Sequence, residues 1–271
     1  MKRITAAITI GVVMCTTLFG MSASVMAEES DWEYIQNKGK LVVGITEFDP
    51  ANYYDENGDL VGFDTELTEA TCKELGLEPE FVIIDWDSKD LELKSKNIDC
   101  IWNMFGVNEE RKSYTDFTYA YIINGEVPVI RKTDSETYTD LESLNQPGLT
   151  VVFEEGSTGQ DCAEESFPDT DLLPVAGQTD AMLEVKAGTA DYAVVDFLTA
   201  SSMTGNPDYS DLMVVPDVVL SIEYDSAGFR KGSDAVEKVN EVLKKLYEDG
   251  TAAAIAEKYG LTDQAVLTED I

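Results

Sequence analysis

The amino-acid sequence predicts an α/β protein with parallel sheets, divided into two domains of modest size. Short apolar segments alternate along the chain with segments in which apolar residues recur at helical spacing. The predicted strands are 41–46, 81–84, 100–104, 149–153 and 193–195. The predicted helices are 66–75, 89–96, 180–187, 236–249 and 252–259. This alternation is typical of parallel sheets covered by helices, and the length of 271 residues fits two such domains.

Two segments of the chain are similar to each other. Residues 93–103 and 185–195 each pass from the end of a helix through a turn and an Asp, Asp99 or Asp191, into an apolar strand. Two α/β lobes of similar design would explain the similarity. Chance is the alternative, because α/β units often look alike.

The N-terminus predicts an exported protein. Lys2 and Arg3 precede an apolar run over 4–19, and small residues lead to Ala27, which together are typical of a cleaved signal peptide over 1–27. A lipid anchor on Cys15 is the alternative, and the large Met14 before it disfavours that reading. No later segment is apolar enough to span a membrane, so we expect the protein in the periplasm or at the outer face of the cell envelope.

Composition excludes several classes of function. The formal net charge of −34 argues against nucleic acid or an anionic membrane as a partner, and a solvated acidic surface is its simplest explanation. The chain has no His, which makes zinc or Ser-His chemistry improbable. Cys72, Cys100 and Cys162 are scattered and odd in number, which argues against a disulfide framework. We therefore expect no metal and no cofactor.

The most informative segment is 59–75, where a short strand leads through Gly62 into an amphipathic helix. Asp64 is placed where an N-cap side chain would bond the first free amides of that helix. The motif Gly-Phe-Asp-x-Glu-Leu at 62–67 resembles the signature of the polar amino-acid solute-binding proteins of ABC importers. The order and spacing of the later segments 86–88, 97–103, 108–111 and 115–118 are also similar to this family.

The resemblance implies a two-lobe, type II periplasmic-binding-protein fold, in which two mixed or parallel sheets are joined by two hinge crossovers. We expect lobe 1 at 28–122 and 225–271, lobe 2 at 123–224, and the crossovers near 121–125 and 223–226. The implied function is capture of an L-α-amino acid between lobes that close on it, followed by delivery to the ABC permease subunits. Such a protein is expected to act as a monomer and not to be an enzyme.

The predicted ligand site lies at 103–106 and at Asp196, because ligands of α/β sheets bind at the carboxyl ends of strands. A planar guanidinium suits a carboxylate, and small residues at a helix start can form an anion-binding nest. The resemblance assigns the ligand carboxylate to Arg111, Ser157, Thr158 and Gly106. Gly106 stands where the family usually has Ser or Thr, so it can offer only its backbone amide.

The ligand amine is assigned by the resemblance to Asp196 and Met104. An ammonium group that loses its water needs a nearby anion to offset that loss. A carboxylate at the end of a strand supplies such an anion. The competing interpretation of Asp196 is an ordinary N-cap of the following helix.

Further residues are expected to line the cleft and to set specificity. They are Phe48, Glu47, Trp86, Asn103 and Glu154. Asn103 is typical of cystine-binding relatives in the family, whereas Glu47 and Glu154 favour a ligand with a cationic side chain. The sequence leaves both ligand classes open.

Two other functions stay open at this stage. A few proteins of this fold, such as periplasmic cyclohexadienyl dehydratases, acquired catalysis through an acidic group in the cleft, and Glu154 or Glu47 could fill that role. A sensory binding protein that passes its closed form to a receptor would have the same sequence features as a transport protein.

Overall fold

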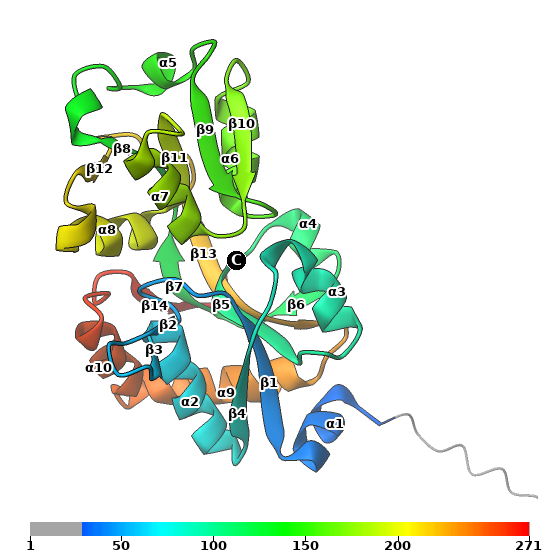
Figure 1. Ribbon diagram of the computed structural model, residues 1–271. Helices are drawn as coiled ribbons and strands as arrows, with labels where there is room; N and C mark the ends of the chain where they lie inside the picture. Colours follow the sequence, from blue (N-terminus) through cyan, green and yellow to red (C-terminus); the bar gives the residue numbers. More distant parts are fainter. Residues whose placement is uncertain (1–28, 271) are drawn as a thin grey trace, which may run out of the picture.

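A computed structural model describes residues 29–270 and has two lobes, each built on its own β-sheet (Figure 1). The predicted signal peptide and Cys15 lie outside the described residues. None of the helices within 29–270 is long and apolar enough to cross a membrane. The two-lobe α/β architecture predicted from the sequence is confirmed.

The first lobe holds a seven-stranded sheet with helices packed against it. Its strands are β1 (Lys40–Ile45), β4 (Glu78–Ile83), β5 (Cys100–Gly106), β6 (Thr115–Phe117), β7 (Ala120–Asn124), β13 (Glu223–Arg230) and β14 (Ala265–Thr268). Its helices are α1 (Asp31–Lys38), α2 (Phe63–Leu75), α3 (Lys89–Lys94), α4 (Glu109–Lys112), α9 (Ala235–Glu248) and α10 (Thr251–Lys258). The strand order is β14-β7-β13-β5-β1-β4, with β6 also paired to β13, and a small hairpin joins β2 (Tyr53–Tyr54) to β3 (Leu60–Val61).

The second lobe holds a five-stranded sheet in the order β10-β9-β11-β8-β12. Its strands are β8 (Glu126–Arg131), β9 (Thr150–Glu154), β10 (Asp171–Val175), β11 (Tyr192–Asp196) and β12 (Leu212–Val214). Its helices are α5 (Leu141–Leu144), α6 (Thr158–Ser166), α7 (Gln178–Ala187) and α8 (Phe197–Gly205).

Both sheets are mixed, and the strand that follows each connection between the lobes, β8 or β13, runs antiparallel to its neighbours. β1 runs parallel to β4 and β5, and β9 runs parallel to β10 and β11, as predicted. β13 is antiparallel to β5 and β7, while β8 is antiparallel to β11 and β12. The chain passes from the first sheet to the second at Gly125 and returns through 215–222. The predicted crossovers near 121–125 and 223–226 both overlap strands, since β7 ends at Asn124 and β13 begins at Glu223.

Each sheet has an apolar core on both of its faces. In the first lobe, Leu67 of α2 and Leu243 of α9 belong to the core on one face, while Leu93 of α3 belongs to the core on the other. In the second lobe, Met182 of α7 and Phe167 after α6 lie in separate cores. Helices therefore cover both sides of each sheet, and the carboxyl ends of the parallel strands are left facing the space between the lobes (Figure 1).

The motif at 62–67 forms the start of α2, but Asp64 does not cap the helix. The amides of Phe63 and Asp64 donate to the backbone carbonyls of Pro50 and Ala51, 2.8 and 3.1 Å away, so the helix start needs no side-chain cap. Gly62 has φ +131°, and a Cβ there would lie 2.1 Å from the Ala51 oxygen, so the close approach of the two segments requires glycine. The N-cap prediction for Asp64 is therefore wrong.

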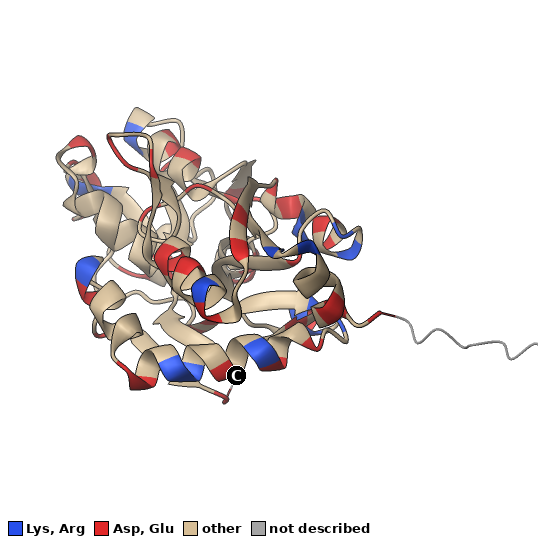
Figure 2. Cartoon of the chain, turned by 90° about the horizontal axis from the view of Figure 1, so that it is seen from below, with Lys and Arg blue, Asp and Glu red and all other residues tan. Residues whose placement is uncertain are grey.

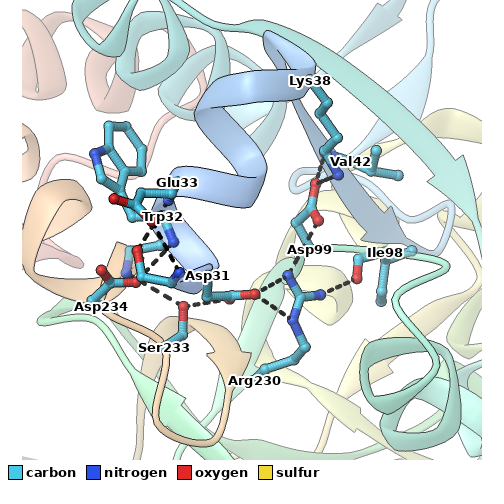
Figure 3. Close-up of polar contacts among 12 residues, drawn as sticks. Asp31, Trp32, Glu33, Lys38, Val42, Ile98, Asp99, Arg230, Ser233 and Asp234 are labelled. Atoms are coloured by element: carbon cyan, nitrogen blue, oxygen red, sulfur yellow. Dashed lines mark hydrogen bonds and ion pairs between the residues drawn. The ribbon is translucent and has the colours of Figure 1, made fainter. Parts of the chain in front are cut away.

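Asp99 and Asp191 hold equivalent places in the two lobes. The amide of Asp99 donates to Val42 O at 2.7 Å, and its Oδ2 accepts the Val42 amide at 2.7 Å (Figure 3). The amide of Asp191 donates to Thr150 O at 2.9 Å, and its Oδ2 accepts the Thr150 amide at 2.8 Å. Each Asp thus links the start of one strand to the neighbouring strand through two hydrogen bonds. The similarity between 93–103 and 185–195 reflects the same hydrogen-bonding arrangement in both lobes.

Acidic residues are distributed over both lobes rather than gathered in one patch (Figure 2). This distribution agrees with a solvated acidic surface. Cys72 and Cys100 are buried free thiols, and Cys162 is a free thiol that is partly exposed. No cluster of His, Cys, Asp or Glu within residues 29–270 could hold a metal ion.

Candidate ligand-binding cleft

A cleft with an empty volume of about 300 Å³ lies between the lobes. The first lobe contributes the end of β5 and the loops after β1 and β4, and the second contributes the ends of β9 and β11. The lining residues are Phe48, Trp86, Asn103, Met104, Gly106, Arg111, Glu126, Glu154, Ser157, Thr158, Gln178, Asp196 and Glu223.

Arg111 presents a buried guanidinium without an ion-pair partner among residues 29–270. Asn108 caps α4 and accepts the Arg111 amide at 2.8 Å, which fixes the backbone. The side chain lies over the Phe105 ring, 4.8 Å from its centre, and Nη1 donates to Gly106 O at 2.8 Å. Since a guanidinium has five N–H donors, most of its donors are available to an anion in the cleft.

Ser157 and Thr158 begin α6 on the opposite side of the cleft. The Ser157 hydroxyl caps the helix by accepting the Gln160 amide at 3.1 Å, and it donates to Glu154 O at 2.7 Å. Its proton is therefore committed inside the second lobe. The Thr158 side chain instead lies near Glu223 and lowers the pKa of that carboxyl group, against the larger effect of burial.

Asp196 ends β11 and makes no side-chain bond to the helix that follows it. The Gln178 amide holds it in place, because Gln178 Nε2 donates to Oδ2 and Gln178 Oε1 accepts the Asp196 amide at 3.0 Å. Glu126 lies opposite Asp196 in register on β8, and burial together with the nearby Asp196 charge raises the pKa of Glu126. The result is an oriented carboxylate at the cleft, which is suited to an ammonium group.

The cleft contains more carboxyl groups than its cations can balance. Burial and the nearby Asp196 raise the pKa of Glu154 to about 8 and that of Glu223 to about 7. The same causes raise the pKa of Glu126 well above its usual value. These carboxyl groups therefore hold protons near neutral pH, and a ligand that brings positive charge would favour their ionisation.

The sequence predictions did not include Glu126, Gln178 and Glu223, all of which line the cleft. Glu126 and Glu223 each lie where a strand meets a connection between the lobes. This position is the one feature of the sequence that could have indicated a place in the cleft. Gln178 follows Gly177 at the first position of α7, and nothing in the sequence around it indicates that it lines the cleft.

Asn103 and Glu47 were expected to face the ligand and set specificity, but neither has a side chain that is free and directed into the cleft. Asn103 lines the cleft, but its Nδ2 donates to Thr46 Oγ1 at 2.8 Å and its Oδ1 accepts the Thr46 and Asn52 nitrogens at 3.0 and 2.8 Å. Its amide therefore mainly joins β5 to neighbouring loops. Glu47 is exposed and lies in an adjacent groove near Tyr53 and Asp180, so the structure does not bring it into the cleft.

Phe48 and Trp86 are buried and line the cleft, as predicted. The Trp86 ring meets the Phe105 ring edge to face, with centres 5.6 Å apart, and Phe105 in turn supports Arg111. Trp86 and Phe105 therefore belong to one packed unit that positions the guanidinium, whereas Phe48 belongs to the core on the other face of the sheet.

Met104 has a positive φ of 44°, which is uncommon for a residue other than glycine. Asp64 Oδ2 accepts the Met104 amide at 2.5 Å and the Tyr121 hydroxyl at 2.9 Å. Burial raises the pKa of Asp64 to about 7. The motif carboxylate thus serves the cleft indirectly, because it holds the end of β5 in the shape that the site requires.

Residues 41–262 match the family model of the bacterial extracellular solute-binding proteins, family 3. The L-cystine-binding protein TcyJ of Escherichia coli (strain K12) is 26% identical over 92% of this chain and 93% of its own length. The arginine-binding extracellular protein ArtP of Bacillus subtilis is 28% identical over 82% and 86%, respectively. A cyclohexadienyl dehydratase of Pseudomonas aeruginosa is 25% identical over 66% and 67%.

The crystal structure of the ancestral amino acid-binding protein AncCDT-1, a precursor of cyclohexadienyl dehydratase, is also similar. It superposes with a TM-score of 0.80 and 29% identity, over 85% of this chain and 99% of the other. The match to the family model spans well over half of the sequence, and the two lobes with their cleft agree with it. This chain belongs to the bacterial extracellular solute-binding proteins, family 3.

Proposed function

We propose that this protein captures a free L-α-amino acid in its cleft and delivers it to an ABC permease after export from the cytoplasm. One observation carries the proposal: Arg111 and Asp196 face the same cleft from different lobes, the first without an ion-pair partner within residues 29–270. A guanidinium and a carboxylate arranged in this way are complementary to the carboxylate and ammonium of an amino acid. Similarity to TcyJ and ArtP supports the same ligand class.

The ligand's side chain is proposed to be cationic. Once Asp196 is paired with the α-ammonium, Glu154 remains in the second lobe as a buried carboxyl that a cationic group could ionise. The amide of Asn103, which favoured a cystine-like ligand, is occupied within the first lobe. Similarity to ArtP, an arginine-binding protein, agrees with this choice.

Calorimetric titration of residues 28–271 against arginine, lysine, ornithine, cystine and the other common amino acids tests the proposal. We expect the tightest binding for a cationic amino acid, and a loss of about 2–5 kcal/mol in Arg111→Ala because a buried partner charge is removed. Undiminished binding to Arg111→Ala, or binding of none of these ligands, would overturn the proposal.

The second candidate function is that of a dehydratase. Glu154 favours it, since a carboxyl whose pKa is raised to about 8 is protonated at neutral pH, as a general acid must be. Similarity to the dehydratase of P. aeruginosa agrees with this candidate. Incubation with prephenate, followed by ultraviolet detection of phenylpyruvate, distinguishes the two functions, and we expect no turnover.

A further inference from the structure

Glu223 occupies part of the region predicted to receive the ligand's carboxylate. Gly106 has no side chain, and a Cβ built on it would lie 2.1 Å from Glu223 Oε2. Arg111 Nη1 is 3.3 Å from the same position. The glycine therefore leaves room for the Glu223 carboxyl group beside the guanidinium.

The groups around Glu223 hold its carboxyl in place. Ser221 Oγ donates to Oε1 at 3.1 Å, and the Thr158 side chain lies near the same carboxyl group and lowers its pKa against the effect of burial. Arg111 is near but is not within 4.0 Å ion-pairing distance, so Glu223 does not neutralise the guanidinium directly.

The charges facing Glu223 come from several elements. Arg111 on α4 is the cation, and it is opposed by Asp196 on β11, Glu126 on β8 and Asp225 on β13 itself. Cys162 of α6 is also near. One cation facing several acids in a buried site favours the protonated form of Glu223, in agreement with its pKa of about 7.

We infer that protonated Glu223 donates a hydrogen bond to the α-carboxylate of the bound amino acid, beside Arg111, so that ligand binding takes up a proton. An ionised Glu223 would repel a carboxylate at this position, whereas the protonated form offers an O–H donor beside Gly106, which has no side-chain donor. The inference rests on the proposed function, because it requires a ligand that has a carboxylate.

Proton uptake at Glu223 gives the affinity a defined pH dependence. With a pKa of about 7 in the free protein, Glu223 lowers the affinity about tenfold between pH 6 and pH 8. The Glu126–Asp196 pair acts in the opposite direction, because a bound ammonium favours ionisation of that pair and releases a proton. The contribution of Glu223 must therefore be isolated by comparing variants.

Calorimetry with arginine at pH 8, in phosphate and in Tris, measures the protons exchanged on binding, because the two buffers differ in ionisation enthalpy. We expect the wild-type protein to take up nearly one proton more than Glu223→Gln. The amide of that variant donates the same hydrogen bond without titrating. Glu223→Gln should retain affinity at pH 6 and lose the tenfold weakening at pH 8. Asp49→Asn is the control, because Asp49 is a partly buried carboxyl whose pKa is also raised by burial, but it neither lines the cleft nor faces Glu223, and the variant should keep the proton uptake.

Two outcomes would overturn the inference alone, namely equal proton uptake by wild type and Glu223→Gln, or a loss of affinity in Glu223→Gln at pH 6 as large as in Arg111→Ala. The proposed function fails differently. If agmatine, the decarboxylated form of arginine, binds as tightly as arginine, Glu223 itself fills the carboxylate site and the ligand is an amine. If arginine binds tightly and agmatine does not, the amino-acid function stands whatever the result for Glu223.

Discussion

Lys89 donates a hydrogen bond from Nζ to the backbone carbonyl of Gly156 at 2.8 Å, which joins the first lobe to the second across the rim of the cleft. Nζ also donates to Trp86 O at 3.0 Å, and the side chain is only 5% exposed. Burial, with Arg111 nearby, lowers the pKa of Lys89 to about 8. We expect this buried cation, which bridges the two lobes, to act as a clasp that keeps the cleft closed.

We expect Lys89→Met to release the ligand faster than the wild-type protein. Loss of a charged donor to a carbonyl costs about 1.5–3 kcal/mol, which corresponds to a dissociation rate about 10- to 150-fold higher if the bond forms only on closure. Stopped-flow displacement of the ligand measures this rate. Lys94→Met is the control, because Lys94 lies on the same helix but pairs with Asp90 at the surface. Equal rates in both variants would show that Lys89 is not a clasp.

Closure of the lobes is the second prediction. Because Arg111 and Asp196 lie on different lobes, a zwitterion contacts both only when the lobes approach, so its binding energy favours the closed state. Small-angle X-ray scattering should show a smaller radius of gyration at saturating ligand. Asp196→Ala should lose most of this change at a concentration that saturates the wild type. An unchanged radius of gyration in the wild type would argue against hinge closure.

Stability should rise as the pH falls from 8.5 to 5.5. Burial raises the pKa of Asp64 to about 7 and that of Glu154 to about 8, whereas the unfolded chain titrates near 4. Between these values the folded state binds more protons than the unfolded state, so the free energy of unfolding decreases as the pH rises. We expect Tm to be at least about 5 °C higher at pH 5.5 than at pH 8.5.

The same direction would follow from repulsion among the surface charges, since the net charge is −34. Salt separates the two causes, because 0.5 M NaCl screens exposed charges and has little effect on buried carboxyls. The difference in Tm should persist in salt, and Glu223→Gln should reduce it. A difference that disappears in salt would assign the effect to the surface.

The strongest local patterns predicted the fold well, and the site less completely. The helices at 66–75 and 236–249 and the strands at 41–46 and 100–104 follow from periodicity, and Asp99 and Asp191 marked a repeated junction. The prediction that Glu47 lines the cleft does not match the structure. Successive side chains of an extended segment point to opposite sides, and its neighbour Phe48 takes the position that faces the cleft.

The pairing of Glu126 with Asp196, and the approach of Glu223 to Gly106, depend on how the two connections cross. At that crossing a Cβ on Gly125 would lie 2.2 Å from Ser221 O. Residues almost a hundred positions apart in the sequence meet there. Patterns of neighbouring residues in the sequence cannot predict this contact. The gathering of acidic residues in the cleft could therefore be recognised only from the structure.

Arg230 holds the N-terminal helix on the first lobe, and its removal should destabilise the protein. Its Nε and Nη2 donate to Asp31 Oδ1 at 2.9 and 2.7 Å, and Nη1 donates to Ile98 O at 2.6 Å (Figure 3). Nη2 also reaches Asp99 Oδ1 at 3.3 Å, while Lys38 pairs with the other oxygen of Asp99. Asp99 is fully buried, so an unpartnered charge there is costly.

We expect Arg230→Met to lower the free energy of unfolding by about 3–5 kcal/mol in urea titration, because it leaves Asp31 and Asp99 without their shared cation. Lys231→Met is the matched control, since Lys231 is the next residue and pairs with Asp116 at the surface, where an ion pair contributes about 0–1 kcal/mol. Ligand affinity should be unchanged in both variants under native conditions, because neither residue lines the cleft. Equal stability of the two variants would mean that Lys38 alone satisfies Asp99.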